Sequence, residues 1–400
     1  MDNAPNSPLP LAGITVLELG MVIAGPFAGS LLADLGATVI KIEPPGTGDA
    51  ARQMGPRKNG VALWWGVATR GKKCITLNLK DPTARALFER LVETADVVVE
   101  NYRPGVLERL GLGWQRLHAI NPRLVLLSIT GFGQTGPGAA RPGFGKIAEG
   151  MSGLVWLTGS PGQNPLFVGY SFADTTAGLF GVFAVNLALY RRDVLGAAGA
   201  RIDLALYEPM LRMMEAQFAM RRAMGHAPTR TGSNDPYGWG RAEARDELFE
   251  FIQAADGQWL EVAAPHDALN DIRKLIGFDG AIGTAHDALR SSLADWAQAR
   301  TSGEVGRELQ KAGAKVAPVL DGLTISKLDY FRERGDVLPA SDPEVGNFDV
   351  TGFFPKHYRR PDSAKAFDGS SLGAHNREIF IERLCITEDE LEDLKRRGAV

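Results

Sequence analysis

The residues that could carry chemistry begin with Asp174, the only ionisable group before the terminal tyrosine of the apolar stretch Phe172 to Tyr190. This stretch predicts a helix, and a helix that is apolar on all sides is usually buried. Asp174 would lie in its first turn, where unpaired N–H groups and the helix dipole favour a carboxylate. Two interpretations stay open on this stretch alone. Asp174 is an N-cap residue, or it is a preorganised carboxylate that acts as a nucleophile or base.

Two loops elsewhere have residue types suited to ligand binding. The turn Val22-Ile23-Ala24-Gly25-Pro26 follows an apolar strand, and its small residues would let a ligand approach backbone N–H groups near a helix start. Tight packing of a strand against a helix explains the same residues equally well. The second loop, Glu100 to Gly105, contains Asn101 and is followed one helical turn later by Arg109. These side chains would form a polar clamp.

Both loops follow short apolar segments that alternate with helical ones. Strands are expected at 14–19, 38–43, 74–79, 96–100 and 124–130, and helices at 27–35 and 82–94. This alternation predicts βαβ units and a parallel sheet with helices on its faces. Because ligands bind beyond the carboxyl ends of parallel strands, both loops would lie at the binding edge.

The rest of the chain predicts a second, smaller domain. A strand at 201–206 and a helix at 207–222 lead into an aperiodic loop; a β-hairpin turning at Asp256-Gly257 and three helices follow. Helices at 376–384 and 387–397 end the chain. The predicted fold class is α/β, a Rossmann-like large domain with a parallel sheet plus a smaller α+β domain. Its parts are 1–200 (large domain), 201–245 (helix and linker), 246–320 (small domain) and 321–400 (return to the large domain).

The composition is that of an ordinary globular protein: 400 residues, 44% hydrophobic and 23% charged, with a formal net charge of −3. It indicates no nucleic acid or membrane partner, and the apolar run around Asp174 suits a core helix better than a membrane span. Cys74 and Cys385 lie far apart, outside any metal-binding pattern, which favours a reducing compartment. No signal peptide is visible, so a cytoplasmic protein is expected.

Known cofactor motifs lack support. Gly131 to Gly136 matches GxGxxG literally, but Pro137 follows in place of a helix and no acidic residue ends a strand about 20 positions later. No P-loop, HExxH pair, GxSxG elbow or kinase signature is present. We therefore expect no metal site and no permanently bound cofactor.

Seven blocks of sequence together resemble the class III (CaiB/BaiF-type) coenzyme A transferases. They occur in the family's order and span nearly the whole chain. The blocks are 10–20 (PLAGITVLELG), 24–26 (AGP), 35–43 (LGATVIKIE), 98–105 (VVENYRPG), 173–174 (AD), 317–319 (APV) and 372–378 (LGAHNRE).

The resemblance implies an activity and a catalytic residue. Asp174 matches the family's catalytic aspartate, which attacks an acyl-CoA thioester to give a mixed anhydride and then an aspartyl-CoA thioester. The substrates would be an acyl-CoA and a small carboxylic acid, and the assembly an interlaced homodimer. The residues predicted to bind coenzyme A are Val22, Ile23, Ala24, Lys72, Lys73, Asn101 and Arg109.

Several positions depart from the family pattern. Pro44 stands where several members have an arginine for a CoA phosphate, and Phe144-Gly145 where members often have Tyr-Asp or Tyr-Glu. A run of glycines that closes over the site is absent, unless 158–162 or 232–240 replaces it. Two alternatives stay open: a 2-methylacyl-CoA racemase, although the chain has no histidine near Phe144 and Glu149 is a poor substitute, and a CoA-ester-binding protein without catalysis.

The donor and the acceptor are not readable from the sequence. Succinate and other short carboxylic acids are the family's usual substrates, and a second carboxylate would require a cation. Arg141, Lys146 and Arg241 are candidates. We also expect the loop 235–240, with Tyr237 and Trp239, to shape the acceptor pocket.

Overall fold

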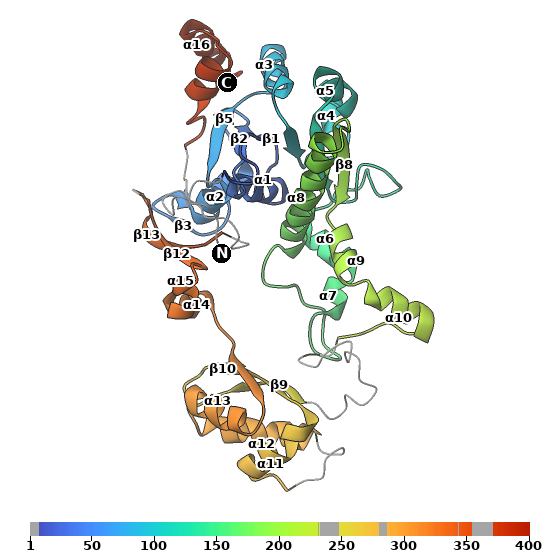
Figure 1. Cartoon of the computed structure of the whole chain (residues 1–400), viewed down its shortest axis with the longest axis vertical. Coiled ribbons are helices and arrows are strands. Elements are labelled where there is room, and N and C mark those ends of the chain that lie inside the picture. Colours follow the sequence, from blue (N-terminus) through green and yellow to red (C-terminus); the bar gives the residue numbers. More distant parts are fainter. Residues whose placement is uncertain (1–7, 231, 233–247, 280–285, 343, 354–370) are drawn as a thin grey trace. The chain divides into compact units, whose positions relative to one another are not determined.

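The computed structural model describes residues 8–230, 232, 248–279, 286–342, 344–353 and 371–400 (Figure 1). The chain divides into two compact units. The first comprises Met1–Gly153, Val168–Met214 and Asp329–Val400, and the second comprises Leu154–Phe167 and Glu215–Leu328.

A six-stranded parallel sheet forms the centre of the first unit. Its strands are β1 (Thr15–Glu18), β2 (Thr38–Glu43), β5 (Lys72–Thr76), β6 (Val97–Glu100), β7 (Val125–Thr130) and β8 (Ala200–Ala205). The order is β5-β2-β1-β6-β7-β8, and each neighbouring pair is parallel. β1, β6 and β7 are buried along their whole length, as expected for apolar strands covered on both faces. The predicted parallel sheet is confirmed.

The strand order reverses direction between β1 and β6. The chain runs outward from β1 through β2 to β5, then crosses to β6 and continues through β7 to β8. This is the order of a Rossmann-like sheet, in which a crevice opens between the two central strands at their carboxyl ends. A ligand site is therefore expected at the loops after β1 and β6.

Helices cover the two faces of this sheet. On one face lie α3 (Pro82–Glu93) and α5 (Trp114–Ile120), whose apolar side chains share a core with Leu17 and Leu126. On the other, α1 (Ala24–Asp34) contacts β1 and β2, while α8 (Phe172–Asp193) contacts β7 and β8. α1 and α8 also pack against each other. α1 starts at residue 24, earlier than the predicted 27, so the small residues of the turn form its first turn.

One side of α8 is exposed, contrary to the expectation of a helix buried on all sides. Leu179, Phe183, Leu187 and Tyr190 form a stripe at helical spacing, each about half or more exposed. By length and composition α8 passes a test for membrane-spanning helices, but half of its most apolar window is buried within the chain. Core helices of soluble proteins pass the same test, so the buried half fits the predicted core helix.

The C-terminal segment covers the edge strand β5. His375 accepts the Cys74 N–H through Nδ1 at 3.0 Å and returns its own N–H to the Cys74 carbonyl at 2.9 Å. Asn376 accepts the Thr76 N–H at 2.8 Å and donates to the Thr76 hydroxyl. The chain then forms a π-helix, η4 (Glu378–Arg383), and α16 (Glu388–Arg396). A capping box at the start of α16 matches the helix start predicted there.

Antiparallel strand pairs occur in both units. In the first unit β12 (Val337–Asp342) pairs with β13 (Gly346–Thr351). The second unit has a three-stranded antiparallel sheet in the order β11-β10-β9, formed by β9 (Leu248–Gln253), β10 (Trp259–Ala264) and β11 (Lys315–Pro318). Gly257, at a φ of 81°, closes the predicted hairpin between β9 and β10. Against this sheet pack α11 (His266–Ile276), α12 (His286–Gln298) and α13 (Ser302–Lys311).

Candidate active site

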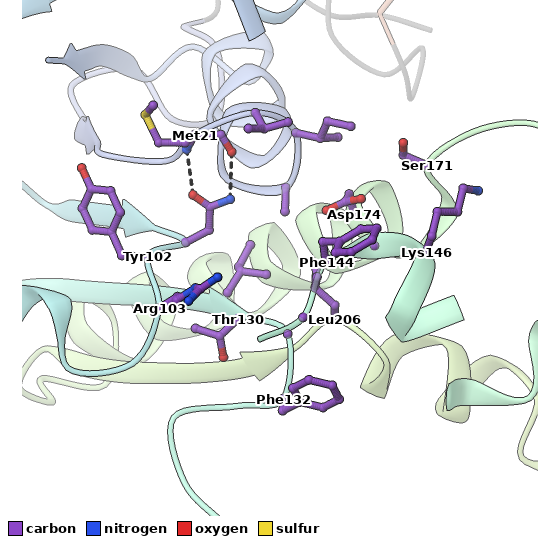
Figure 2. A pocket seen from close by; sticks show the side chains of 18 of the residues that line it. Met21, Tyr102, Arg103, Thr130, Phe132, Phe144, Lys146, Ser171, Asp174 and Leu206 are labelled. Carbon is purple, nitrogen blue, oxygen red and sulfur yellow. Dashed lines mark hydrogen bonds between the residues drawn. The ribbon is translucent and has the colours of Figure 1, made fainter. Parts of the chain in front are cut away.

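A cavity of about 380 Å³ opens at the carboxyl ends of β1, β6 and β7 (Figure 2). Its walls include residues 20–26, which comprise the loop after β1 and the first turn of α1 and are together called the β1–α1 loop. The other walls are the segments after β6 and β7 and the N-terminal ends of α6 (Gly145–Ser152) and α8. This is where the strand order places a ligand. Five of the residues predicted for the site line the cavity together: Val22, Ile23, Ala24, Asn101 and Asp174.

Asp174 is the third residue of α8, because the helix starts at Phe172 after the N-cap Ser171. The N-cap interpretation of Asp174 is therefore wrong. Burial raises the pKa of its carboxyl group to about 6, the nearby Glu149 carboxylate adds to the rise, and Lys146 partly opposes it. Asp174 is thus mostly ionised at neutral pH, but its charge is poorly solvated, and both properties favour a nucleophile.

Gly145 makes room for the Asp174 carboxylate. A Cβ atom added at residue 145 would lie 2.0 Å from Asp174 Oδ2, far inside van der Waals contact. The carboxylate therefore lies directly against the first residue of α6. The departure from the family pattern at Phe144-Gly145 has a physical consequence. The glycine permits this position of the Asp174 carboxylate, while the Phe144 ring, 63% exposed, lines the cavity beside it (Figure 2).

An ion pair between a partly exposed lysine and a buried glutamate supports the start of α8 next to Asp174. Lys146 Nζ lies 2.8 Å from Glu149 Oε2 and also donates to the carbonyl of Tyr170 at 2.7 Å. Glu149, which is fully buried, accepts the N–H of Phe172 at 3.1 Å. Glu149 therefore satisfies a first-turn N–H of α8 and fixes the helix that carries Asp174.

The β1–α1 loop is held by side chains from two other segments. Asn101 accepts the Met21 N–H at 2.7 Å and donates to the Met21 carbonyl at 2.9 Å (Figure 2). The carboxylate of Asp49 accepts the Val22 N–H at 3.0 Å. Among the described residues, neither the Ile23 nor the Ala24 N–H has an acceptor. These two donors, at the start of α1, are free to face a ligand.

The start of α1 and Asp174 belong to the same contact between helices. Gly178 lies one turn after Asp174 on the same face of α8. A Cβ at residue 178 would approach the Ala24 carbonyl oxygen to 3.1 Å and the Phe27 ring to 2.8 Å. The absence of a side chain at Gly178 thus lets the N-terminus of α1 approach the helix turn that carries the carboxylate.

Three predicted site residues lie outside the cavity. The Lys72 ammonium is fully buried, 2.7 Å from Glu18 Oε2 and 2.6 Å from the Pro26 carbonyl, so in this arrangement it does not reach a phosphate. Lys73 pairs with Glu378. Arg109 ends α4 (Val106–Arg109), where its guanidinium lies 3.1 Å from the Cβ position of Gly105.

The predicted acceptor residues are distributed unevenly. Arg141 and Lys146 both line the cavity. Arg241 and the loop 235–240, with Tyr237 and Trp239, lie outside the described residues. Over the described ranges, no group of three or more His, Cys, Asp or Glu side chains is arranged to hold a metal ion.

Sequence reasoning missed a cluster of buried charges behind the β1–α1 loop. Lys41, in the middle of β2, lies between Glu18 Oε1 at 3.2 Å and Asp49 Oδ2 at 2.7 Å. A lysine inside the apolar run Thr38–Glu43 was the available signal, since such a position is seldom open to water in a central strand.

Comparison with known proteins identifies the family. The family model described as CoA-transferase family III matches residues 11–376. The chain belongs to this family. It is 36% identical to the succinyl-CoA--D-citramalate CoA-transferase of Chloroflexus aurantiacus, over 98% of both chains. It is 35% identical to the acetyl-CoA:oxalate CoA-transferase of Acetobacter aceti, over 85% of this chain and 90% of the relative.

A solved structure agrees with this assignment. The crystal structure of a CaiB/BaiF family protein from Brucella suis superposes with a TM-score of 0.81 at 31% identity, covering 94% of this chain and all of the other. The protein is thus a CoA transferase, an enzyme of the EC 2.8.3 type, whose substrate is a coenzyme A thioester. The predicted family and activity are confirmed.

Proposed function

We propose that this enzyme transfers coenzyme A from an acyl-CoA to a dicarboxylic acid through covalent intermediates on Asp174. The observation that carries the proposal is the position of Asp174: a half-buried carboxylate in the cavity, with its pKa raised to about 6, next to the N-terminus of α1. The fold and the family support the reaction class, and the position of Asp174 supports its role as the nucleophile.

The reaction has two symmetric halves. An oxygen of the Asp174 carboxylate attacks the thioester carbonyl, the C–S bond breaks, and a mixed anhydride and CoA thiolate result. The thiolate attacks the Asp174 carbonyl carbon, which releases the donor acid and leaves an aspartyl-CoA thioester. The acceptor carboxylate displaces the thiolate to form a second anhydride. The thiolate then attacks the acceptor's carbonyl, which forms the new acyl-CoA and regenerates the Asp174 carboxylate.

Each attack creates a negative oxygen that requires hydrogen-bond donors. The Ile23 and Ala24 N–H groups at the start of α1 suit this role, because they lie at the positive end of a helix and line the same cavity as Asp174. Preorganised donors of this kind typically contribute about 10²–10³ in rate. Asn101 and Asp49, which occupy the donors and acceptors of Met21 and Val22, leave these two N–H groups for the substrate.

The test is intact-mass measurement after incubation with succinyl-CoA, followed by hydroxylamine trapping and peptide mapping. Wild-type protein is expected to give a hydroxamate on Asp174, and Asp174→Asn none. Asp193→Asn is a matched control, because Asp193 ends the same helix and pairs with Arg123 and Arg192 away from the cavity.

Three results would contradict the mechanism. A hydroxamate that persists in Asp174→Asn would place the nucleophile elsewhere. α-Proton exchange into deuterated solvent without any adduct would favour the racemase. Tight binding of the ester with neither adduct nor exchange would favour a CoA-ester-binding protein without catalysis.

The acceptor class rests on the relatives and on one cation. Both relatives named above use dicarboxylic acids by name, citramalate and oxalate. Arg141 lines the cavity and forms no ion pair with any residue in the described part of the chain, so it suits the second carboxylate. We expect Arg141→Gln to raise the KM of a dicarboxylate acceptor about tenfold, the loss of one charged hydrogen bond. The KM of a monocarboxylate is the internal control, and an equal rise in both would refute this assignment.

We also propose the interlaced homodimer. The apolar stripe on α8 supports it, since Leu179, Phe183, Leu187 and Tyr190 would otherwise present a continuous hydrophobic surface to water. Phe183→Lys is expected to give monomers in sedimentation velocity, whereas Phe251→Lys, at an exposed aromatic of the second unit, should leave the dimer intact. Monomeric wild-type protein would refute the proposal.

The remaining predictions stand as proposals of the same kind. Residues 1–200 and 321–400 would form the large CoA-binding domain and 246–320 the small one, joined by 201–245. Lys73 and Arg109 would lie near the nucleotide. The enzyme would be cytoplasmic and would work without a permanently bound cofactor.

A further inference from the structure

A cluster of buried charges lies directly behind the β1–α1 loop. Lys41, Lys72, Glu18 and Asp49 have fully buried side chains. Glu18 bridges the two lysines, with Oε1 at 3.2 Å from Lys41 Nζ and Oε2 at 2.7 Å from Lys72 Nζ. Asp49 Oδ2 lies 2.7 Å from Lys41 Nζ. Even when each charge is paired, a buried cluster of this kind often stabilises a fold no more than apolar residues of similar size, so stability alone is a weak reason for it.

The cluster contacts the backbone of the loop at both ends and in the middle. Lys41 donates to the Gly20 carbonyl and Lys72 to the Pro26 carbonyl. Between them, the Asp49 carboxylate accepts the Val22 N–H at 3.0 Å and the Ala51 N–H at 2.9 Å. The charged groups therefore fix the loop at Val22. The next two residues, Ile23 and Ala24, line the cavity and have N–H groups without an acceptor among the described residues.

Val22 needs such support because of its backbone conformation. Its φ is 68°, and a β-branched residue seldom adopts this left-handed region. Such strain persists only where surrounding contacts impose it, and it often occurs at functional sites. If Val22 relaxed to a negative φ, the chain after it would turn and the Ile23 and Ala24 N–H groups would point elsewhere.

Two glycines show how tightly the cluster and the loop are fitted. A Cβ at Gly29, on α1, would lie 1.9 Å from Glu18 Oε2, so the absence of a side chain there admits the carboxylate. A Cβ at Gly25 would lie 2.7 Å from the Cα of Gly20, so the two ends of the loop touch. A small displacement of the cluster is therefore transmitted to the loop.

We propose that Asp49, oriented by Lys41, is a positioning residue of the transferase reaction: its carboxylate holds Val22 in the left-handed conformation that aims the Ile23 and Ala24 N–H groups at the oxygen attached to the reacting carbon. Asp49 does not line the cavity, so it acts through the loop. The inference rests on the proposed function.

The test compares three variants by the rate of hydroxamate formation on Asp174 and by kcat and KM with succinyl-CoA. Asp49→Ala removes the acceptor of the Val22 N–H and is expected to lower both rates about 10²-fold, as for a lost oxyanion donor. Asp49→Asn keeps an acceptor oxygen but loses the ion pair that orients it, and a loss of about tenfold is expected. KM should change much less than kcat, because donors that act on the developing charge matter mainly in the transition state.

Glu43→Gln is the matched control. Glu43 is a fully buried carboxylate that pairs with Arg52 at 2.7 Å and accepts the Asp49 N–H at 2.9 Å. The carbonyl oxygen of a glutamine can accept the same N–H, so Glu43→Gln removes a buried charge but keeps the contact that holds Asp49. Its substitution should lower the melting temperature without lowering kcat more than about twofold. We expect kcat to be highest in Glu43→Gln, lower in Asp49→Asn and lowest in Asp49→Ala. If Asp49→Ala does not fold, the comparison of Asp49→Asn with Glu43→Gln decides.

A kcat of Asp49→Asn equal to that of Glu43→Gln would overturn the inference, as would equal losses in Asp49→Asn and Asp49→Ala. The proposed function fails separately: wild-type protein would then give no hydroxamate on Asp174. If the hydroxamate on Asp174 forms in Asp49→Ala at the same rate as in wild type, only the positioning role is refuted.

Discussion

Replacing Asp174 by asparagine should stabilise the folded chain, and should do so only at the higher pH values. Burial raises the pKa of Asp174 from its ordinary 3.8 to about 6. The unfolded chain therefore loses this proton at lower pH than the folded chain does. The favourable contribution of the protonated carboxyl is fully present below 3.8 and is lost as the pH rises through 6.

The shift sets the size of the effect. About two pKa units, at 1.36 kcal/mol each, correspond to roughly 2–3 kcal/mol of stability lost to ionisation of this group near neutral pH. Asparagine has nearly the same shape and cannot ionise. The free energy of unfolding of Asp174→Asn, relative to wild type, should therefore increase by about 2 kcal/mol between about pH 4.5 and pH 8.

The assay is urea unfolding of both proteins at the two pH values. At each pH the free energy of unfolding of the variant is compared with that of wild type, because the other groups titrate alike in both proteins. Asp321→Asn is a control of opposite sign. Asp321 caps α14 (Gly322–Lys327), and the Thr324 hydroxyl and N–H hold its pKa below the ordinary value. That variant should lose stability at the higher pH and recover as the pH falls.

If the difference in the free energy of unfolding between Asp174→Asn and wild type is the same at both pH values, the reasoning is refuted. A loss of stability at pH 8 would show that the carboxylate stabilises the helix start, as a cap does. The experiment thus separates a stabilising carboxylate from a poorly solvated one without measuring activity.

Three further predictions follow from individual contacts. The single-turnover rate of hydroxamate formation should rise with pH and reach half its maximum near pH 6, since only ionised Asp174 attacks. A rate that does not change with pH would exclude Asp174 as the titrating nucleophile. Gly145→Ala places a Cβ 2.0 Å from Asp174 Oδ2 and should lower kcat about 10²-fold with little change in melting temperature. Unchanged turnover would show that the carboxylate works from another rotamer. Asn376→Ala leaves the Thr76 N–H without its acceptor and should lower the free energy of unfolding, measured in urea, by about 1–3 kcal/mol. A decrease below about 0.5 kcal/mol would mean that water replaces the amide.

The sequence predicts the frame of the site well because the frame depends on local patterns. Apolar runs give the strands of the parallel sheet, and the small residues after β1 give a loop close to a helix start. The position of Asp174 near the head of an apolar helix also follows from its neighbours. Once the sheet is parallel, its carboxyl edge collects these segments.

The parts that the sequence does not predict depend on tertiary contacts. Lys72 was expected near phosphates, but whether a lysine meets a ligand or an internal carboxylate depends on Glu18, which is far away in the chain. Nothing local requires a φ of 68° at Val22. The hydrogen bond that the Val22 N–H donates to the Asp49 carboxylate holds the residue in this conformation. The apolar stripe on α8 has the composition of a core, so the sequence alone does not reveal that this side of the helix is exposed in the single chain.

The cover of β5 by the C-terminal segment has a consequence for biosynthesis. The Thr76 N–H finds its partner 300 residues later, in Asn376. A ribosome that has finished every strand of the parallel sheet has still not made the segment that closes its edge. Until then the nascent chain exposes an open row of N–H and C=O groups, a site at which strands of other chains can add. Synthesis of the segment that contains His375 and Asn376 is therefore the step that ends this exposure. Loss of this segment to a nonsense codon or a protease should promote aggregation more than the few lost contacts suggest.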